Sequence, residues 1–323
     1  MINPYCSANF LTFFTTFFAR LFGGAWWREG LASDELQLLT LLFIALSASL
    51  VGTFLVLRKM TMLANALSHT VLLGIVTVHL LAWAITGKMG GIAVISFPVL
   101  FFAALITGLL TTFATQFLKS VLRVQEDASI GLVFTLFFSI GVILVTLFAR
   151  SSHLSTEIVT GNIDMLRRED LTLSLYMAAF NMLIIILFFK EYKVLAFDEG
   201  YAKALGIRVH FYNYLLMFQV AATSIIAFRA VGVLLVLAFM TAPVIVARLY
   251  THSLRHLLFL APIFAIFVSA LGVALSRHLL TVYGLPLSTA GLTVSLMALL
   301  LICAMIPYFL KIKAGGRLAL SKG

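Results

Sequence analysis

Long uncharged runs recur along almost the whole chain. A hydrocarbon core about 30 Å thick is crossed by roughly 20 helical residues that each rise about 1.5 Å. Backbone groups inside lipid must bond within their own segment, and the runs lack the alternation of barrel strands. We therefore predict an all-α, polytopic transmembrane helix bundle of about nine spans. The predicted spans are Leu36–Leu57, Met60–Ile85, Gly91–Leu118, Ala128–Phe148, Leu171–Phe189, Phe211–Phe228, Ala230–Ala247, Leu257–Leu275 and Leu287–Leu310.

The division between the sixth and seventh spans decides whether their number is odd. Only Arg229 and Gly232 interrupt a continuous apolar stretch there, so the prediction requires a tight hairpin. Pro243 lies in the following span, where a proline bends a helix. We interpret Gly232 and Pro243 as a kinked and movable part of the bundle.

Composition supports the membrane assignment. With 62% hydrophobic and 11% charged residues, a soluble domain of 323 residues would lack a polar surface. The formal charge of +10 comes from basic residues scattered singly between spans, which indicates lipid headgroups and not nucleic acid as the partner. Cys6 and Cys303 lie far apart and form neither a disulfide framework nor a zinc motif.

The distribution of lysine and arginine predicts the orientation in the bilayer. With the N-terminus outside and the C-terminus inside, 14 of the 22 basic residues fall in cytoplasmic loops, as the positive-inside rule requires. We expect three regions: an extracytoplasmic or interfacial segment at 1–35, a transmembrane permease domain at 36–310, and a basic cytoplasmic tail at 311–323. The aromatic residues before position 30 predict an interfacial helix.

Few residues inside the spans could carry chemistry. None of the nine spans contains an acidic residue, which argues against a proton relay or an aspartyl intramembrane protease. The sequence has no GxxxxGK[ST] motif, so nucleotide-driven transport would need an ATPase on a separate chain. Asn65 and His69, four residues apart, share one helix face, where an imidazole and an amide could bind a divalent cation. The alternative is a histidine that bonds to a neighbouring helix.

The sequence around this pair resembles a known family. Arg58-Lys59 followed by Asn65-Ala-Leu-Ser-His69 and Gly74 is similar to the signature of metal-type ABC importer permeases. Further patches that resemble the family follow in the same order, and together the resemblance covers about Leu36 to Leu310. These patches are Asp127–Thr135, Phe197–Gly206, Val231–Val236, Thr241–Pro243 and Ala247–Leu249.

The resemblance implies the permease subunit of an ATP-driven importer for zinc, manganese or iron in the bacterial plasma (inner) membrane. The metal would be cargo, with no bound cofactor. Partners would be a cytoplasmic ABC ATPase, an extracytoplasmic metal-binding protein and a second permease subunit. His69 takes the family's metal-contact role, whereas Asn65 stands where the family has aspartate and Leu73 stands where it has proline.

The neutral amide of Asn65 leaves the charge of a desolvated cation uncompensated. We therefore expect a heterodimer in which a related permease supplies a carboxylate. A homodimer that uses His69 with carbonyls and waters is the alternative. The histidine His278, beside Arg277 at the outer end of the eighth span, could line the metal entry, or it could cap carbonyls or contact headgroups.

The polar segment Phe197–Val209 reads as a short surface helix ended by a glycine. The resemblance makes it the coupling helix that seats in the ATPase, with Asp198, Ala202, Leu205 and Gly206 as its matching residues. An ordinary solvated loop helix is the alternative. Competing functions are a permease for haem or siderophore chelates and a secondary cation transporter. An intramembrane metalloenzyme would need a motif such as HExxH, which the sequence lacks.

Overall fold

The fold was analysed in a computed structural model, which describes residues 4–5, 9–24, 26, 30–86, 97–148, 163 and 166–320. These residues form helices joined by short irregular connections, and no strand occurs among them. The helices are α1 (Phe10–Phe22), α3 (Ser33–Leu57), α4 (Thr61–Thr86), α5 (Phe97–Val121), α6 (Glu126–Phe148), α8 (Arg168–Leu187), α9 (Phe189–Phe197), α10 (Glu199–Ala204), α11 (Val209–Val231), α12 (Val233–Tyr250), α13 (Leu254–Tyr283) and α14 (Thr289–Leu320).

Each of the nine predicted spans lies for the most part within one helix. Eight of these helices are long and apolar enough, over the described residues, to cross a membrane: α3, α5, α6, α8, α11, α12, α13 and α14. The second predicted span corresponds to α4, a helix of 26 residues that packs against α5 and α6. The start of the third predicted span, residues 91–96, lies outside the described residues. The all-α polytopic bundle is confirmed.

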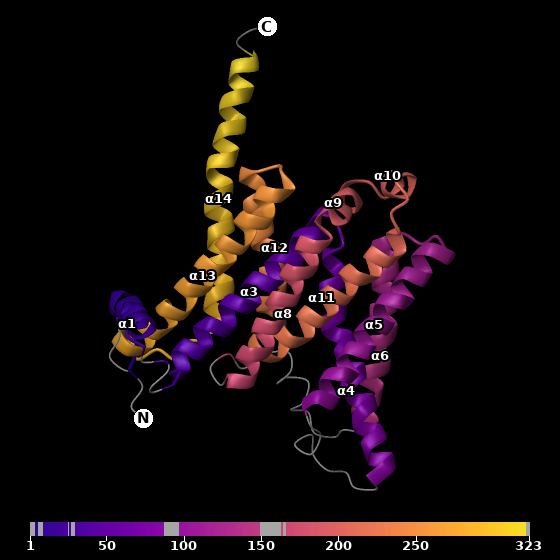
Figure 1. Cartoon of the computed structure of the whole chain (residues 1–323), viewed down its shortest axis with the longest axis horizontal. Coiled ribbons are helices and arrows are strands. Elements are labelled where there is room, and N and C mark those ends of the chain that lie inside the picture. The colour runs from indigo at the N-terminus through magenta and orange to yellow at the C-terminus, as the bar shows by residue number, and fades with distance from the viewer. Residues whose placement is uncertain are drawn as a thin grey trace.

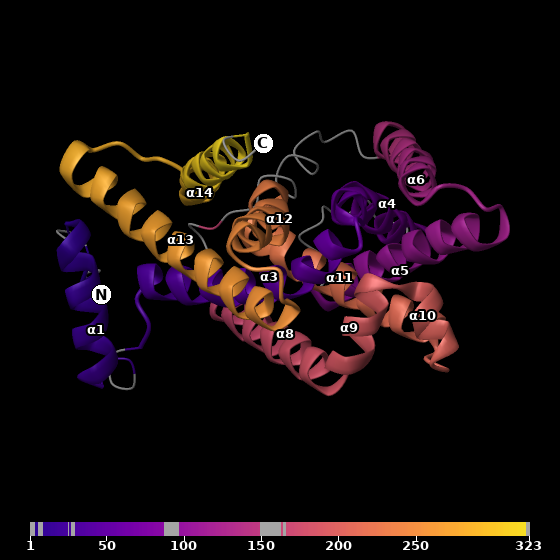
Figure 2. The same ribbon diagram turned by 90° about the horizontal axis from the view of Figure 1, so that it is seen from above.

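The helices form two groups joined by α11 (Figures 1 and 2). In one group α3 packs against α8, α12 and α13, and α14 packs against α12 and α13. In the other group α4, α5 and α6 pack against one another. Because α11 contacts α3, α4 and α5, it holds the two groups together. The group of α4 to α6 therefore forms a separate flank of the molecule.

The chain reverses direction between α11 and α12. Gly232 separates the two helices with a φ of 83°, a left-handed backbone that favours glycine. The two predicted spans are therefore distinct helices. In Figure 1, α1 and the start of α3 lie at one end of the bundle, and α14 finishes at the opposite end. We call these the α1 end and the α10 end.

The helices α3 and α8 begin earlier than the uncharged runs suggest, with acidic residues in their first turns. Asp34 and Glu35 occupy the first turn of α3 and are buried, and Glu169 and Asp170 occupy the first turn of α8. Carboxylates are favourable there because the exposed N–H groups at a helix start carry partial positive charge. Acidic residues are thus part of the helices, although they remain at their ends.

The N-terminal helix α1 is fastened to the bundle by buried polar contacts. The Tyr5 hydroxyl donates to Glu35 at 3.0 Å, and Arg20 pairs with the same carboxylate at 2.6 Å. Phe13 and Phe17 face inward, whereas Leu11 and Phe22 are largely exposed. At the other end of the chain, α14 continues as a helix to Leu320 and projects beyond its neighbours (Figure 1), across residues that the sequence places in a tail.

Candidate functional site

The predicted metal contacts lie on α4, where it faces α6. The ring centroid of His69 lies 5.3 Å from the centroid of Phe134 and 5.3 Å from that of Phe138. These two phenylalanines are one helical turn apart on α6. The His69 side chain is partly buried, and Asn65, one turn earlier on the same face, is exposed. We call this region of Asn65, His69, Phe134 and Phe138 the α4–α6 seam.

Small residues set the position of α4 in its group. A β-carbon added at Gly74 would lie 2.8 Å from the carbonyl oxygen of Ala103 on α5, so only glycine allows this approach. On the α6 side, the buried Leu73 packs beside Gly141. The helix α4 continues without interruption from Thr61 to Thr86, past the position where the family pattern has proline.

The chain alone brings no set of metal ligands together at the seam. Among the described residues, there is no group of three or more His, Cys, Asp or Glu side chains close enough to hold a metal ion. His278 lies on α13, which is on the other side of α3 and α11 from α4 and α6 (Figures 1 and 2). Its ring packs 6.1 Å from that of Tyr283. His69 and His278 therefore belong to different parts of the molecule.

The predicted coupling segment forms the short helix α10. Asp198 caps it by accepting hydrogen bonds from the backbone N–H groups of Gly200 at 2.7 Å and Tyr201 at 3.0 Å. Ala202 is fully buried and faces Leu195 and Val209. The helix is followed by Gly206, which has a φ of 75°.

The segment around α10, from the end of α9 to Leu205, exposes three large apolar side chains. Phe197, Tyr201 and Leu205 are 62%, 58% and 54% exposed. Three large exposed apolar side chains on so short a segment form a surface suited to a protein partner. This arrangement fits the coupling role that the sequence predicts, and it gives Leu205 and Ala202 opposite positions: one outward, one inward.

An ionic anchor that the sequence analysis missed ties α10 to the transmembrane helices. Arg58, at the end of α3, pairs with Glu199 on α10 and donates a hydrogen bond to the Asn213 side chain on α11 at 2.7 Å. Lys119 near the end of α5 approaches the same Glu199 carboxylate at 3.9 Å. The sequence contained a signal for Arg58 because this residue opens the family-like motif, but nothing in it indicated Glu199 as the partner.

A buried network of hydrogen bonds joins four helices of the bundle. The Tyr192 hydroxyl donates to Gln219 at 2.7 Å, and Gln219 donates to Asn181 at 3.2 Å. Asn181 donates to the hydroxyls of Ser47 and Thr223, each at 2.7 Å. We call these five residues the amide network; they join α9, α11, α8 and α3. Burial raises the pKa of Tyr192, so its hydroxyl remains a donor at physiological pH.

The predicted kink residues lie at a tight contact between α3 and α12. Pro243 is buried within α12, which follows Gly232 directly. A β-carbon at Gly52 of α3 would overlap the carbonyl of Met240 on α12. The backbones of α3 and α12 therefore approach each other closely just before Pro243, with no room for a side chain at Gly52. A movement of α12 about Gly232 would have to alter this contact.

Comparisons with known proteins identify the family. Residues 36–307 match the ABC 3 transport family. The chain belongs to the ABC 3 transport family. A relative from Chlamydia muridarum, named "Probable metal transport system membrane protein", is 38% identical over 310 residues, 96% of each chain. The "Manganese transport system membrane protein MntD" of Bacillus subtilis is 39% identical over 231 residues, 68% of this chain and 75% of that one.

A solved structure supports the same conclusion. The structure described as "PsaBC from Streptococcus pneumoniae in complex with Fab" is similar with a TM-score of 0.66 and 30% identity, over 84% of this chain and 90% of that chain. As a member of the ABC 3 transport family, the chain is a multi-pass permease subunit of the bacterial inner membrane. ATP hydrolysis belongs to a separate chain, and a substrate-binding protein is a further partner.

Proposed function

We propose that this chain is the membrane permease of an ATP-driven importer for a divalent first-row metal, with manganese as the first candidate. The observation that carries the proposal is the match of 96% of the chain to a relative named for metal transport, together with matches over 68% and 73% of the chain to two relatives named for manganese transport. The metal is the cargo and not a resident cofactor. Zinc and iron fit the same imidazole chemistry. The full-length match favours free metal over haem or siderophore chelates and over a secondary carrier.

We place the α10 end in the cytoplasm and the N-terminal helix outside. The ends of α3 and α5 and the helices α9 and α10 meet at this end (Figure 1) and carry Arg58, Lys59, Lys119 and Arg123. This arrangement satisfies the positive-inside rule. The exposed apolar side of α10 then faces the cytoplasmic ATPase. Closure of the ATPase would pull on Glu199, and Arg58 would pass the movement to α3.

The α4–α6 seam is the proposed passage for the metal. His69 supplies a nitrogen ligand, and Asn65 is exposed on the same face, where a second subunit could cover it. A desolvated divalent cation needs negative charge nearby, and neither side chain carries any. A related permease that places a carboxylate opposite Asn65 would meet this need. The heterodimer is therefore the proposed assembly, and a homodimer is its alternative.

Reconstitution tests the cargo and the assembly together. Vesicles that contain this permease, a related permease and the ATPase should take up manganese when the binding protein and ATP are supplied. Vesicles with this permease as the only membrane subunit should take up little. Uptake at the full rate by the single-permease vesicles would disprove the heterodimer, and transport of haem or chelates with no metal uptake would disprove the cargo.

The variant His69→Ala should abolish metal uptake while the protein still inserts and assembles. The matched control is His210→Ala, which removes an exposed imidazole from the first turn of α11 and should leave uptake unchanged. Normal uptake by His69→Ala would show that transport does not depend on a contact between the metal and His69.

A further inference from the structure

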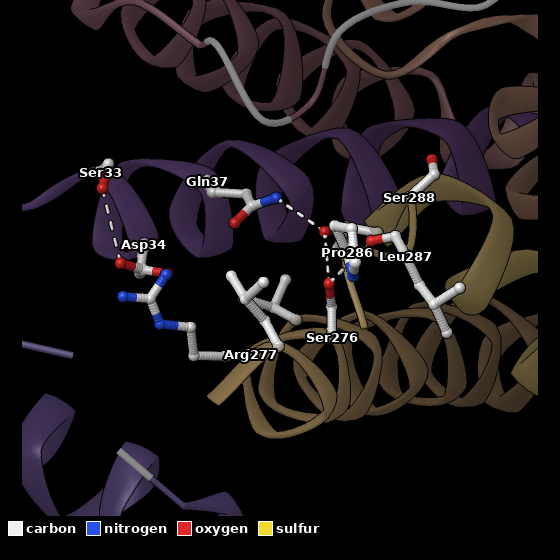
Figure 3. A pocket seen from close by; sticks show the side chains of 11 residues that line it. Ser33, Asp34, Gln37, Ser276, Arg277, Pro286, Leu287 and Ser288 are labelled. Carbon is white, nitrogen blue, oxygen red and sulfur yellow. Dashed lines mark hydrogen bonds and ion pairs between the residues drawn. The ribbon is translucent and has the colours of Figure 1, made fainter. Parts of the chain in front are cut away.

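A cavity of about 370 Å³ opens at the α1 end between α3, α13 and the start of α14 (Figure 3). Its volume falls in the range of roughly 300–1,000 Å³ that is typical of small-molecule sites. It belongs to the group of helices on the far side of α11 from the α4–α6 seam (Figures 1 and 2). The cavity is therefore separate from the proposed metal passage, and no part of the proposed function uses it.

Two opposite charges line the cavity. Asp34 on α3 and Arg277 on α13 face each other with 3.5 Å between the carboxylate and the guanidinium, as Figure 3 shows. Arg277 is held in place because its Nε donates to the backbone carbonyl of Tyr5 at 3.0 Å. The site thus presents one fixed cation and one fixed anion side by side.

Hydroxyl and amide groups continue the polar lining toward α14. Gln37 donates to the Thr289 hydroxyl at 3.0 Å, and Thr289 donates to Ser276 at 3.0 Å. The helix α14 begins at Thr289 and has no acidic residue in its first turn, so its N–H groups are not neutralised locally. Together with Arg277, this helix start favours an anionic group such as a phosphate.

The remaining lining is apolar and lies at the membrane boundary. Leu280 and Leu287 are 43% and 46% exposed, and Pro286 lies beside them. The cavity sits where α3 and α14 begin and where α13 approaches its end, which is the level of the lipid headgroups for a spanning bundle. A ligand here meets charge on one side and hydrocarbon on the other.

We propose that this cavity binds the zwitterionic headgroup of a phospholipid, with phosphatidylethanolamine as the matching chemistry. Arg277, with the N–H and hydroxyl groups at the start of α14, holds the phosphodiester. Asp34 accepts hydrogen bonds from the primary ammonium. The glycerol and first acyl carbons rest on Leu280 and Leu287. The bound lipid would fasten α3, α13 and α14 together.

Native mass spectrometry of the purified full chain tests this proposal. After incubation with vesicles of equal phosphatidylethanolamine and phosphatidylglycerol, the protein should retain phosphatidylethanolamine in preference. Arg277→Gln should lower its retention about tenfold, because a charged contact to the phosphate is lost. Asp34→Asn should remove the preference between the two lipids, since both keep the phosphodiester. Arg255→Gln, an exposed arginine at the α10 end, is the matched control and should change nothing.

A second variant keeps the test decisive if Arg277→Gln does not fold. Ser288→Trp fills the cavity from its exposed rim without touching the Asp34–Arg277 pair, and it should lower retention equally. Equal retention of both lipids by the wild-type protein, or unchanged retention by both variants, would overturn the proposal. Displacement of the lipid by inorganic phosphate as readily as by phosphoethanolamine would also overturn it, because the cavity would then be a simple anion site.

Discussion

The amide network and the α4–α6 seam are both polar features within an apolar bundle, but they are built differently. In the network each side chain bonds to another, so that Asn181 alone joins Ser47, Thr223 and Gln219. In the seam, the His69 ring lies against two phenyl rings on a partly exposed face. Paired buried polar groups fix a structure, whereas an ionisable side chain within a membrane span is a candidate for a functional role.

The largest expected effect comes from the Arg58–Glu199 anchor, which joins α3 to the proposed ATPase contact on α10. Arg58→Ala removes the buried guanidinium that joins α3 to Glu199 and Asn213. We expect metal uptake in reconstituted vesicles to fall about tenfold while ATP hydrolysis persists, because the lost guanidinium hydrogen bonds contribute about 1.5 kcal/mol or more to holding α10 on α3. Lys190→Ala, an exposed change on α9 outside the predicted coupling segment, is the control. Uptake that stays coupled in Arg58→Ala would show that α10 does not act through α3.

A change inside the network should affect stability more than transport. Asn181→Leu leaves the partners of a fully buried amide unpaired, at a cost of about 1–3 kcal/mol. The unfolding midpoint in detergent should fall, while uptake per folded molecule stays close to that of the wild type. The neighbouring Met182→Leu, at a 50% exposed position, should leave the midpoint unchanged. A normal midpoint for Asn181→Leu would mean that the network does not hold the helices.

The smallest effect concerns pH. Because burial raises the pKa of Tyr192, the folded protein binds this proton more tightly than the unfolded chain does. The contribution of Tyr192 to the free energy of unfolding is fully present below the ordinary tyrosine pKa of about 10, and it is lost as the pH rises above that value. Tyr192→Phe should therefore weaken the alkaline loss of stability, measured as the unfolding midpoint from pH 8 to 11. An identical pH profile in Tyr192→Phe would exclude Tyr192 as a source of that loss.

The sequence predicted the bundle because span length and lipid chemistry leave few choices. Runs of apolar residues located all nine helices, and the left-handed Gly232 confirmed that α11 and α12 are separate. Helix starts were less predictable, since Asp34 and Glu35 are charged yet buried through contacts with Arg277, Tyr5 and Arg20. Such long-range pairs leave no local pattern in the sequence.

The candidate site was predicted only in part, for a similar reason. The four-residue spacing placed Asn65 and His69 on one face of α4, and the polar segment at α10 was located correctly. The Phe134 and Phe138 rings around His69, and the Arg58–Glu199 anchor, depend on how distant helices pack. The contact of His69 and Asn65 with metal stays a prediction, because any carboxylate from a second subunit lies beyond this chain.

Pulsed electron paramagnetic resonance on manganese in the assembled transporter tests most directly whether the metal meets His69. The account predicts a nitrogen coupling to the bound manganese ion, from the imidazole, that disappears in His69→Ala and persists in His278→Ala. A bound ion without nitrogen coupling, or one whose coupling survives in His69→Ala, would contradict the passage of metal along the α4–α6 seam.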